Sequence, residues 1–217
     1  MVSYRSGVHA MSIYDDPKEP FKDAASIADR IDAEGAISLA VIDAHRALDL
    51  YWSAANLPFA LQPETTGRGH VRQQVEISPL SYLSGEHPIA TLARRVVADL
   101  SRAFDSLERT PFATPFAPND IVLQRYQPGS LGITPHHDGT SRVNLVCVLM
   151  LWGDGEFALC DDRAGTNPRT LFAPPGHLIL MKAPGFRGAD LGPFHLISRI
   201  SRGRLILGIR ERRFLPR

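Results

Sequence analysis

The second half of the chain consists of short apolar runs, and this feature restricts its possible folds most strongly. Between residues 111 and 217, stretches rich in branched and aromatic residues alternate with clusters of Gly, Pro, Asn and Asp. Such runs are typical of β-strands, and such clusters are typical of turns. We predict eight strands, at residues 121–127, 133–137, 143–151, 156–160, 169–172, 177–182, 194–198 and 204–210. Many short strands at this spacing predict a sandwich or a barrel.

The first half has a helical periodicity instead. Apolar residues recur about every 3.6 positions in three segments, at 21–33, 44–55 and 89–107. Asp43 is suited to cap the second helix, and Pro88 is suited to begin the third. A buried strand is also expected at 36–42. Helices followed by strands predict an α+β fold in which the helices pack on one sheet.

A chain of 217 residues is long enough for a single domain with a sizeable core. We expect one domain over 1–217, with an N-terminal arm at 1–20. A helical support layer follows at 21–110, and the β-rich core occupies 111–217.

The segment 59–87 interrupts the support layer. It is polar and rich in turn formers, which predicts a surface loop or a short hairpin. A plain loop and a lid over a site are both compatible with its polar run of Arg68, His70, Arg72, Gln73 and Gln74.

Composition excludes several classes of protein. Lys and Arg together number 24 and Asp and Glu 23, so the net charge of +1 does not attract the whole protein to nucleic acid or to a membrane surface. No apolar run approaches the roughly 20 residues of a membrane span. We expect the two cysteines, Cys147 and Cys160, to be free thiols in a reducing cytoplasm. The sequence leaves the oligomeric state open.

The most informative pattern is the pair His136 and Asp138. Residues two apart on a strand face the same side, so both side chains can point at one metal ion while His137 points away. Two histidines and one carboxylate on one side of an iron leave positions for a co-substrate and O₂. The third ligand is expected downstream. His195, 57 residues after Asp138, is preferred over His177, which begins an apolar run.

The last predicted strand supports this hypothesis. Arg204, Ile206, Gly208 and Arg210 share one face, and the alternate residues form an apolar face suited to packing against helices. A buried arginine needs an anionic partner, which a dicarboxylate co-substrate supplies through a bidentate contact. A partner carboxylate within the protein is the alternative.

These features together resemble the Fe(II)- and 2-oxoglutarate-dependent dioxygenase superfamily. The resemblance covers roughly residues 119–213 and rests on four elements in the family's order. They are the RYxPG segment around Tyr126, His136-x-Asp138, the distal His195 and Arg204. The resemblance implies a double-stranded β-helix, or jelly roll, with N-terminal helices that support one sheet.

The same resemblance implies a role for each site residue. His136, Asp138 and His195 would ligate Fe(II), and Arg204 would hold the distal carboxylate of 2-oxoglutarate. Further implied or candidate contacts to this co-substrate are Tyr126, Gln124, Asn144 and Arg210. The implied reaction uses O₂, hydroxylates a C–H bond and releases succinate and CO₂.

Two branches of the superfamily are most similar. The segment RYQPG…TPHHD is similar to that of prolyl hydroxylases, which usually hold the co-substrate with Lys where this chain has Arg204. AlkB-type nucleic-acid demethylases end in R-x-N-x-T-x-R. Arg204 and Arg210 match its arginines, but Ile206 and Gly208 stand at its Asn and Thr. The branch therefore stays open.

The sequence does not identify the substrate. We expect a small molecule, with demethylation of nucleic acid and hydroxylation of a protein or peptide as alternatives. The alternative outside enzymes is a jelly-roll binding module without catalysis.

Overall fold

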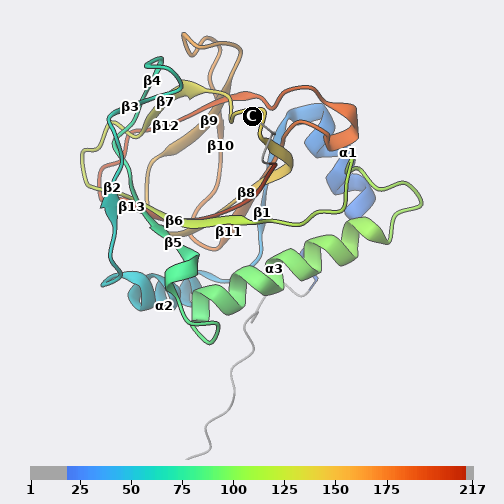
Figure 1. Cartoon of the computed structure of the whole chain (residues 1–217), viewed down its shortest axis with the longest axis horizontal. Helices are drawn as coiled ribbons and strands as arrows, with labels where there is room; N and C mark the ends of the chain where they lie inside the picture. The colour runs from blue at the N-terminus through green and yellow to red at the C-terminus, as the bar shows by residue number, and fades with distance from the viewer. Residues whose placement is uncertain (1–18, 214–217) are drawn as a thin grey trace, which may run out of the picture.

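The computed structural model describes residues 19–213 as two facing antiparallel sheets with helices on one side (Figure 1). The larger sheet has seven strands, in the order β1 (Ala36–Ala40), β11 (His177–Lys182), β8 (Arg142–Gly153), β13 (Arg204–Arg212), β6 (Asp120–Tyr126), β5 (Glu76–Pro79) and β2 (Ala60–Leu61). The smaller sheet has four, in the order β10 (Arg169–Leu171), β9 (Glu156–Cys160), β12 (Phe194–Ser198) and β7 (Ile133–His136). This arrangement confirms the predicted α+β jelly roll.

Three helices lie against the larger sheet, namely α1 (Ala24–Glu34), α2 (Ala44–Ala54) and α3 (Pro88–Asp105). The predicted cap of α2 is confirmed, because the Asp43 side chain accepts a hydrogen bond from the Arg46 N–H at 2.8 Å. Pro88 is the first residue of α3, as expected. The first helix begins at Ala24 rather than at residue 21, because Asp23 caps it by accepting from the Ser26 N–H.

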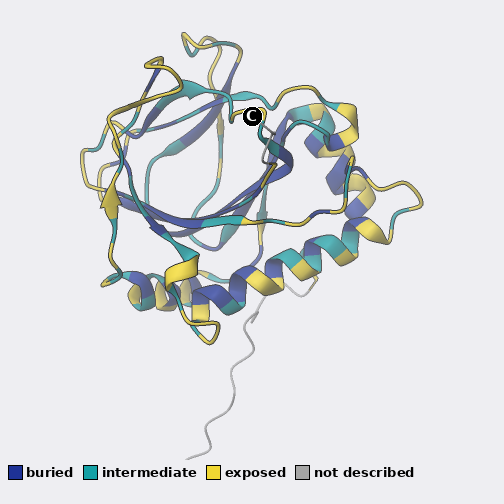
Figure 2. Ribbon diagram, viewed as in Figure 1, coloured by how far each residue is buried: buried dark blue, intermediate teal, exposed yellow. Residues whose placement is uncertain are grey.

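The larger sheet separates two apolar cores. Leu205, Leu207 and Ile209 of β13 face the helices, and Ile206 faces the smaller sheet, as the alternation in the sequence predicts. Figure 2 shows the buried residues along the strands and on the inner sides of the helices. The functional candidates of β13, Arg204 and Arg210, therefore belong to the face directed between the sheets.

The segment 59–87 contains more regular structure than expected. β5 joins the larger sheet beside β6, and β2 pairs with β5. Between them, β3 (Thr65–Thr66) and β4 (Val71–Arg72) form a separate hairpin. A short helical turn, η1 (Leu80–Tyr82), leads to α3, and a second, η2 (Phe186–Gly188), precedes β12. The segment is thus partly an edge of the main sheet and not only a surface loop.

The β3–β4 hairpin lies against β7. The Arg72 N–H donates to the Thr134 hydroxyl at 2.9 Å, and the Gln74 N–H donates to the Gly132 carbonyl at 2.9 Å. A lid function for this segment stays a prediction, and so does the division of the chain into arm, support layer and core. The predicted arm lies outside the described residues, apart from Glu19 and Pro20.

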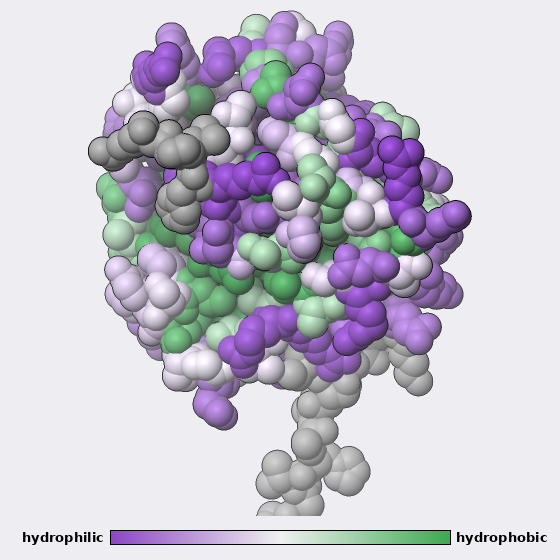
Figure 3. Space-filling model, turned by 45° about the vertical axis from the view of Figure 1, so that its right-hand side comes forward, coloured by the Kyte–Doolittle hydropathy of each residue, from purple (hydrophilic) through white to green (hydrophobic). Residues whose placement is uncertain are grey.

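Both cysteines are free and buried, as predicted, and burial raises the pKa of the Cys147 thiol. No helix in residues 19–213 has the length and apolar character that crossing a bilayer requires. On the face shown in Figure 3, polar side chains surround a hollowed patch of apolar ones.

Candidate metal and co-substrate site

The structure brings His136, Asp138 and His195 together between the two sheets. His136 on β7 and His195 on β12 are direct partners across neighbouring strands, and their ring centroids lie 4.3 Å apart. Asp138 follows the end of β7 by two residues. One ligand atom from each of the three side chains lies within 4.8 Å of the other two. The rival His177 is elsewhere, on β11, where its Nδ1 is 3.0 Å from the Ser38 hydroxyl.

Backbone carbonyls fix the orientation of both histidine rings. His136 Nδ1 is 2.9 Å from the Thr134 carbonyl, and His195 Nδ1 is 3.2 Å from the Pro193 carbonyl. A carbonyl can only accept, so each Nδ1 carries the proton and each Nε2 is left with its lone pair. This is the arrangement usual for histidines that bind a metal. His137 faces away, as predicted, with its ring 3.6 Å from that of Phe194.

The electrostatics suit a divalent cation. Burial lowers the pKa of His136 to about 4, and repulsion from protonated His195 adds to this effect. Burial also lowers the pKa of His195. Burial alone would raise the pKa of Asp138, but the interactions with His195, Arg210 and Arg142 outweigh it and lower the pKa. At neutral pH the three groups are two neutral imidazoles and one carboxylate, which is the donor set expected for iron.

Tyr126 and Arg204 form a second polar group in the same interior. They are direct partners across β6 and β13, and Arg204 is only 2% exposed. Arg204 Nη1 donates to the Gly155 carbonyl at 3.0 Å, but its Nε and Nη2 and the Tyr126 hydroxyl have no hydrogen-bond partner among residues 19–213. Buried donors without a partner are costly. A carboxylate bound here would satisfy all of them.

Gln124 and Arg210 lie on the same face of the larger sheet. Gln124 Oε1 accepts a hydrogen bond from Arg210 Nη2 at 2.9 Å, so Gln124 directly holds the arginine. Gly208 leaves room for this contact. A Cβ atom at that position would lie only 3.2 Å from Arg210 Nη2. The structure therefore places Arg210 and Gln124 on the face between the sheets and links them to each other, and their contact with a co-substrate stays a prediction.

Asn144, expected as a candidate contact to the co-substrate, instead binds a loop and the end of β13. Its Oδ1 accepts from the Ala113 N–H at 3.2 Å, and its Nδ2 donates to Glu211 Oε2 at 2.8 Å and to the Thr114 carbonyl at 3.1 Å. These contacts hold a loop and the end of β13. The register of β8 and β13 shifts at this point, and Asn144 has a φ of 61°. The amide is therefore not directed at the co-substrate region.

Arg142 and Asp120 are two residues that the sequence did not single out. Arg142 Nε lies 3.8 Å from Asp138 Oδ1, and Arg142 Nη2 lies 3.4 Å from Asp120 Oδ2. The sequence contained only a weak indication that Arg142 lies near the metal ligands. Arg142 stands four residues after Asp138 at the start of a strand, and nothing in its spacing marks it as part of a site.

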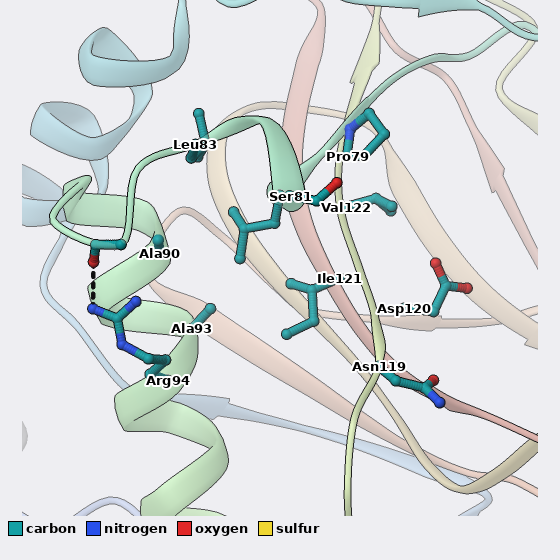
Figure 4. Close-up of a pocket in the computed structure, with 12 residues that line it drawn as sticks. Pro79, Ser81, Leu83, Ala90, Ala93, Arg94, Asn119, Asp120, Ile121 and Val122 are labelled. Carbon is teal, nitrogen blue, oxygen red and sulfur yellow. Dashed lines mark hydrogen bonds between the residues drawn. The ribbon is translucent and has the colours of Figure 1, made fainter.

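A surface hollow of about 450 Å³ lies apart from these residues, between η1, α3 and the start of β6 (Figure 4). Arg94 of α3 and Asp120 of β6 stand on opposite sides of it. None of the three clustered residues His136, Asp138 and His195 lines it. The three potential metal ligands thus lie in the interior between the sheets and not in this hollow.

In comparisons by sequence, no family model and no curated protein matches the chain. Comparison by structure finds clear similarity. An oxidoreductase of the 2OG-Fe(II) oxygenase family from Burkholderia pseudomallei has a TM-score of 0.62 at 16% identity, covering 91% of this chain and 92% of that one.

Two further solved structures are prolyl hydroxylases. A Trichoplax adhaerens prolyl hydroxylase in complex with a hypoxia-inducible-factor peptide has a TM-score of 0.64 at 12% identity, covering 89% of this chain and 90% of that one. A viral collagen prolyl hydroxylase from Paramecium bursaria Chlorella virus-1, in complex with 2OG, has a TM-score of 0.56 at 14% identity, covering 82% and 96%. The chain therefore has the fold of the 2OG-Fe(II) oxygenase superfamily, and it brings a His-Asp-His cluster together inside that fold.

Proposed function

We propose that this protein is an Fe(II)- and 2-oxoglutarate-dependent dioxygenase that hydroxylates a C–H bond of a small molecule, with release of succinate and CO₂. One observation carries the proposal. The same interior contains three metal-type ligands and, separately, buried Tyr126 and Arg204 donors that lack a partner among residues 19–213. A metal ion and a carboxylate are the two groups that these donor atoms suit.

The proposed ligands of Fe(II) are His136, Asp138 and His195. Bound iron would supply the activation of O₂ and the oxidation of the C–H bond. The protein contributes the geometry. The Thr134 and Pro193 carbonyls hold the two imidazole rings in the tautomer that presents Nε2. Asp138 keeps its negative charge because nearby cationic groups lower its pKa.

The proposed partners of 2-oxoglutarate are Arg204 and Tyr126, acting on its distal carboxylate. Arg204 offers a charged donor at Nη2, and Tyr126 offers a neutral one. Burial raises the pKa of Tyr126 to about 12, so its hydroxyl keeps the proton that it donates. Inner-core residues such as Phe157 and Ile206 exclude water around these groups.

Hydroxylation of a peptide is the second candidate. It is favoured by the similarity to two prolyl hydroxylases, one of them in complex with a peptide. Demethylation of nucleic acid is less favoured, since the chain has a net charge of only +1. A location in the cytoplasm is also part of the proposal and is supported by the two free thiols.

The direct test is succinate formation by protein loaded with Fe(II) without oxygen and then given 2-oxoglutarate and O₂. We expect slow, iron-dependent release of succinate that is absent in Arg204→Ala. Arg102→Gln, an exposed change on α3, is the control and should retain the rate. A protein that binds neither Fe(II) nor 2-oxoglutarate would instead be a jelly-roll binding module.

A further inference from the structure

Asp138 is the carboxylate among the three proposed metal ligands, and Arg142 reaches it from the turn that follows. The turn is closed by a hydrogen bond from the Arg142 N–H to the Gly139 carbonyl at 2.8 Å. It is also tied to the end of β13, because the Arg213 N–H donates to the Ser141 carbonyl at 2.8 Å. These backbone contacts place the Arg142 side chain beside Asp138, with its Nε 3.8 Å from Oδ1.

A second carboxylate, that of Asp120, holds the other side of the same guanidinium group. Arg142 Nη2 donates to Asp120 Oδ2 at 3.4 Å. Asp120 begins β6 and pairs directly with Arg210 of β13, so the larger sheet fixes its backbone. Its neighbour Ile121 packs on the helix side, which directs Asp120 to the interior face. Figure 4 shows the Asp120 carboxylate pointing away from α3. Arg142 therefore connects a fixed strand to Asp138.

The Nε donor of Arg142 has no other partner. The atom is buried and makes no hydrogen bond within residues 19–213, and a buried donor without a partner is costly. Burial lowers the pKa of Arg142, and attraction to Asp138 is the largest effect that opposes it. A shift of about 1 Å would turn the 3.8 Å separation into a hydrogen bond. Contacts in active sites commonly tighten in this way when the ligands of the site bind.

We propose that Arg142 is a positioning residue, which holds one oxygen of the Asp138 carboxylate so that only the other oxygen binds the metal. Asp120 fixes Arg142 for this role. The inference rests on the proposed function. A carboxylate that binds through one oxygen preserves the open positions that the co-substrate and O₂ use, whereas binding through both oxygens fills one of them. Arg210 is not in the same place, since it donates to Gln124 and forms no ion pair within 4.0 Å in residues 19–213.

The affinity for metal separates positioning from charge, because the two effects have opposite signs. Arg142 is a cation, so its charge alone repels a divalent metal, and its removal would then tighten metal binding. Removal of a group that orients a metal ligand weakens binding instead, typically by about 10- to 100-fold. An ion pair with only a structural role would change stability and leave the affinity of the folded protein unchanged.

The experiment titrates the whole chain with Mn(II) and follows the electron paramagnetic resonance signal of the free ion. Arg142→Met removes both the charge and the donors, and it should raise the Kd for Mn(II) by about 10- to 100-fold. Arg142→Lys keeps the charge but lacks the planar fork that reaches two carboxylates, so its Kd should also rise. Arg125→Gln is the matched control. It breaks a similarly half-buried ion pair with Glu76 in the same sheet and should leave the Kd unchanged.

A double-variant cycle tests the role of Asp120. Asp120→Asn alone should raise the Kd for Mn(II), because Arg142 loses its second partner. Added to Arg142→Met, it should raise the Kd no further, since Asp120 acts through Arg142. Urea denaturation of each variant checks that it is folded. Arg142→Lys and Asp120→Asn give the same test if Arg142→Met does not fold.

The visible spectrum of the Co(II)-loaded protein is an independent measurement, because it depends on the number and geometry of the donors around the metal. At saturating Co(II), Arg142→Met should change the spectrum, since both oxygens of Asp138 are then free to bind. Arg125→Gln should keep the spectrum of the parent protein.

Three results would overturn the inference. They are an unchanged or lowered Kd for Mn(II) in Arg142→Met, an unchanged Co(II) spectrum in that variant, and a further rise of the Kd when Asp120→Asn is added to it. Asp138→Ala tests the proposed function separately. If that variant loses the metal while Arg142→Met binds it fully, only the positioning role is lost. If the parent protein binds no Mn(II), or Asp138→Ala binds it equally well, the ligand assignment itself fails.

Discussion

Replacing Tyr126 by Phe should affect stability and co-substrate binding in opposite ways. The side chain is 1% exposed, and its hydroxyl has no partner among the described residues. A buried hydroxyl without a partner costs about 1–3 kcal/mol in the folded state. Removing it should therefore leave the free energy of unfolding of the metal-free protein unchanged or raise it by about 1 kcal/mol.

The same hydroxyl is proposed to donate to the distal carboxylate of 2-oxoglutarate. A hydrogen bond to a charged group is worth about 1.5–3 kcal/mol, which corresponds to about a 10- to 100-fold change in affinity. Tyr126→Phe should raise the Kd for 2-oxoglutarate by that factor. Arg204 would still supply the charged contact, so binding is weakened and not abolished.

Urea denaturation of the metal-free protein measures the first quantity, and calorimetric titration of the Mn(II)-loaded protein measures the second. Tyr51→Phe is the matched control. That ring stacks on Trp152 on the helix side of the larger sheet, 4.7 Å between centroids, and should affect neither quantity strongly. The reasoning would be refuted if Tyr126→Phe destabilised the fold by more than about 1 kcal/mol and left the Kd unchanged, because the hydroxyl would then be a structural donor.

Three further predictions concern two of the proposed metal ligands and Asn144. Asp138→Ala should abolish binding of Mn(II) in equilibrium dialysis while circular dichroism shows an intact fold; retained stoichiometric binding would disprove the ligand assignment. Metal-free protein should lose stability as the pH falls from about 6.5 to 4, because the pKa of folded His136 is lowered to about 4 and the unfolded chain binds the proton first. The loss from this residue is about 3 kcal/mol in urea titrations, and His136→Gln should flatten the slope. Asn144→Ala should destabilise the protein by about 2–4 kcal/mol, since it removes the hydrogen bonds of Asn144 to the Ala113 N–H, the Thr114 carbonyl and the buried Glu211 carboxylate, with an unchanged Kd for 2-oxoglutarate in the folded fraction.

The sequence predicted those parts of the molecule that depend on regular alternation. On β13 the period of two placed Leu205 and Leu207 toward the helices and Arg204 toward the interior, and the structure has the same arrangement. The strand geometry also brought His136 and Asp138 together. Choosing His195 as the third residue depended on rejecting His177 because of the apolar run after it.

The features that the sequence did not predict depend on irregular backbone and on the pairing of strands far apart in the chain. Asn144 was a candidate contact because it is the one polar residue in an apolar predicted strand, but a bulge with positive φ turns it toward the loop at Ala113 and Thr114. The strands within 59–87 are mostly two residues long, which is too short for a periodic signal. Arg142 and Arg212 face each other only because β8 and β13 pair, and that register is not visible in either segment alone.

Titration of 2-oxoglutarate into the Fe(II)-loaded protein under anaerobic conditions tests the central claim most directly. The account predicts binding of one molecule per chain, which requires the metal and is lost in both Arg204→Ala and His195→Ala. Binding that persists without metal or in Arg204→Ala, or no binding to a protein that holds Fe(II), would contradict it.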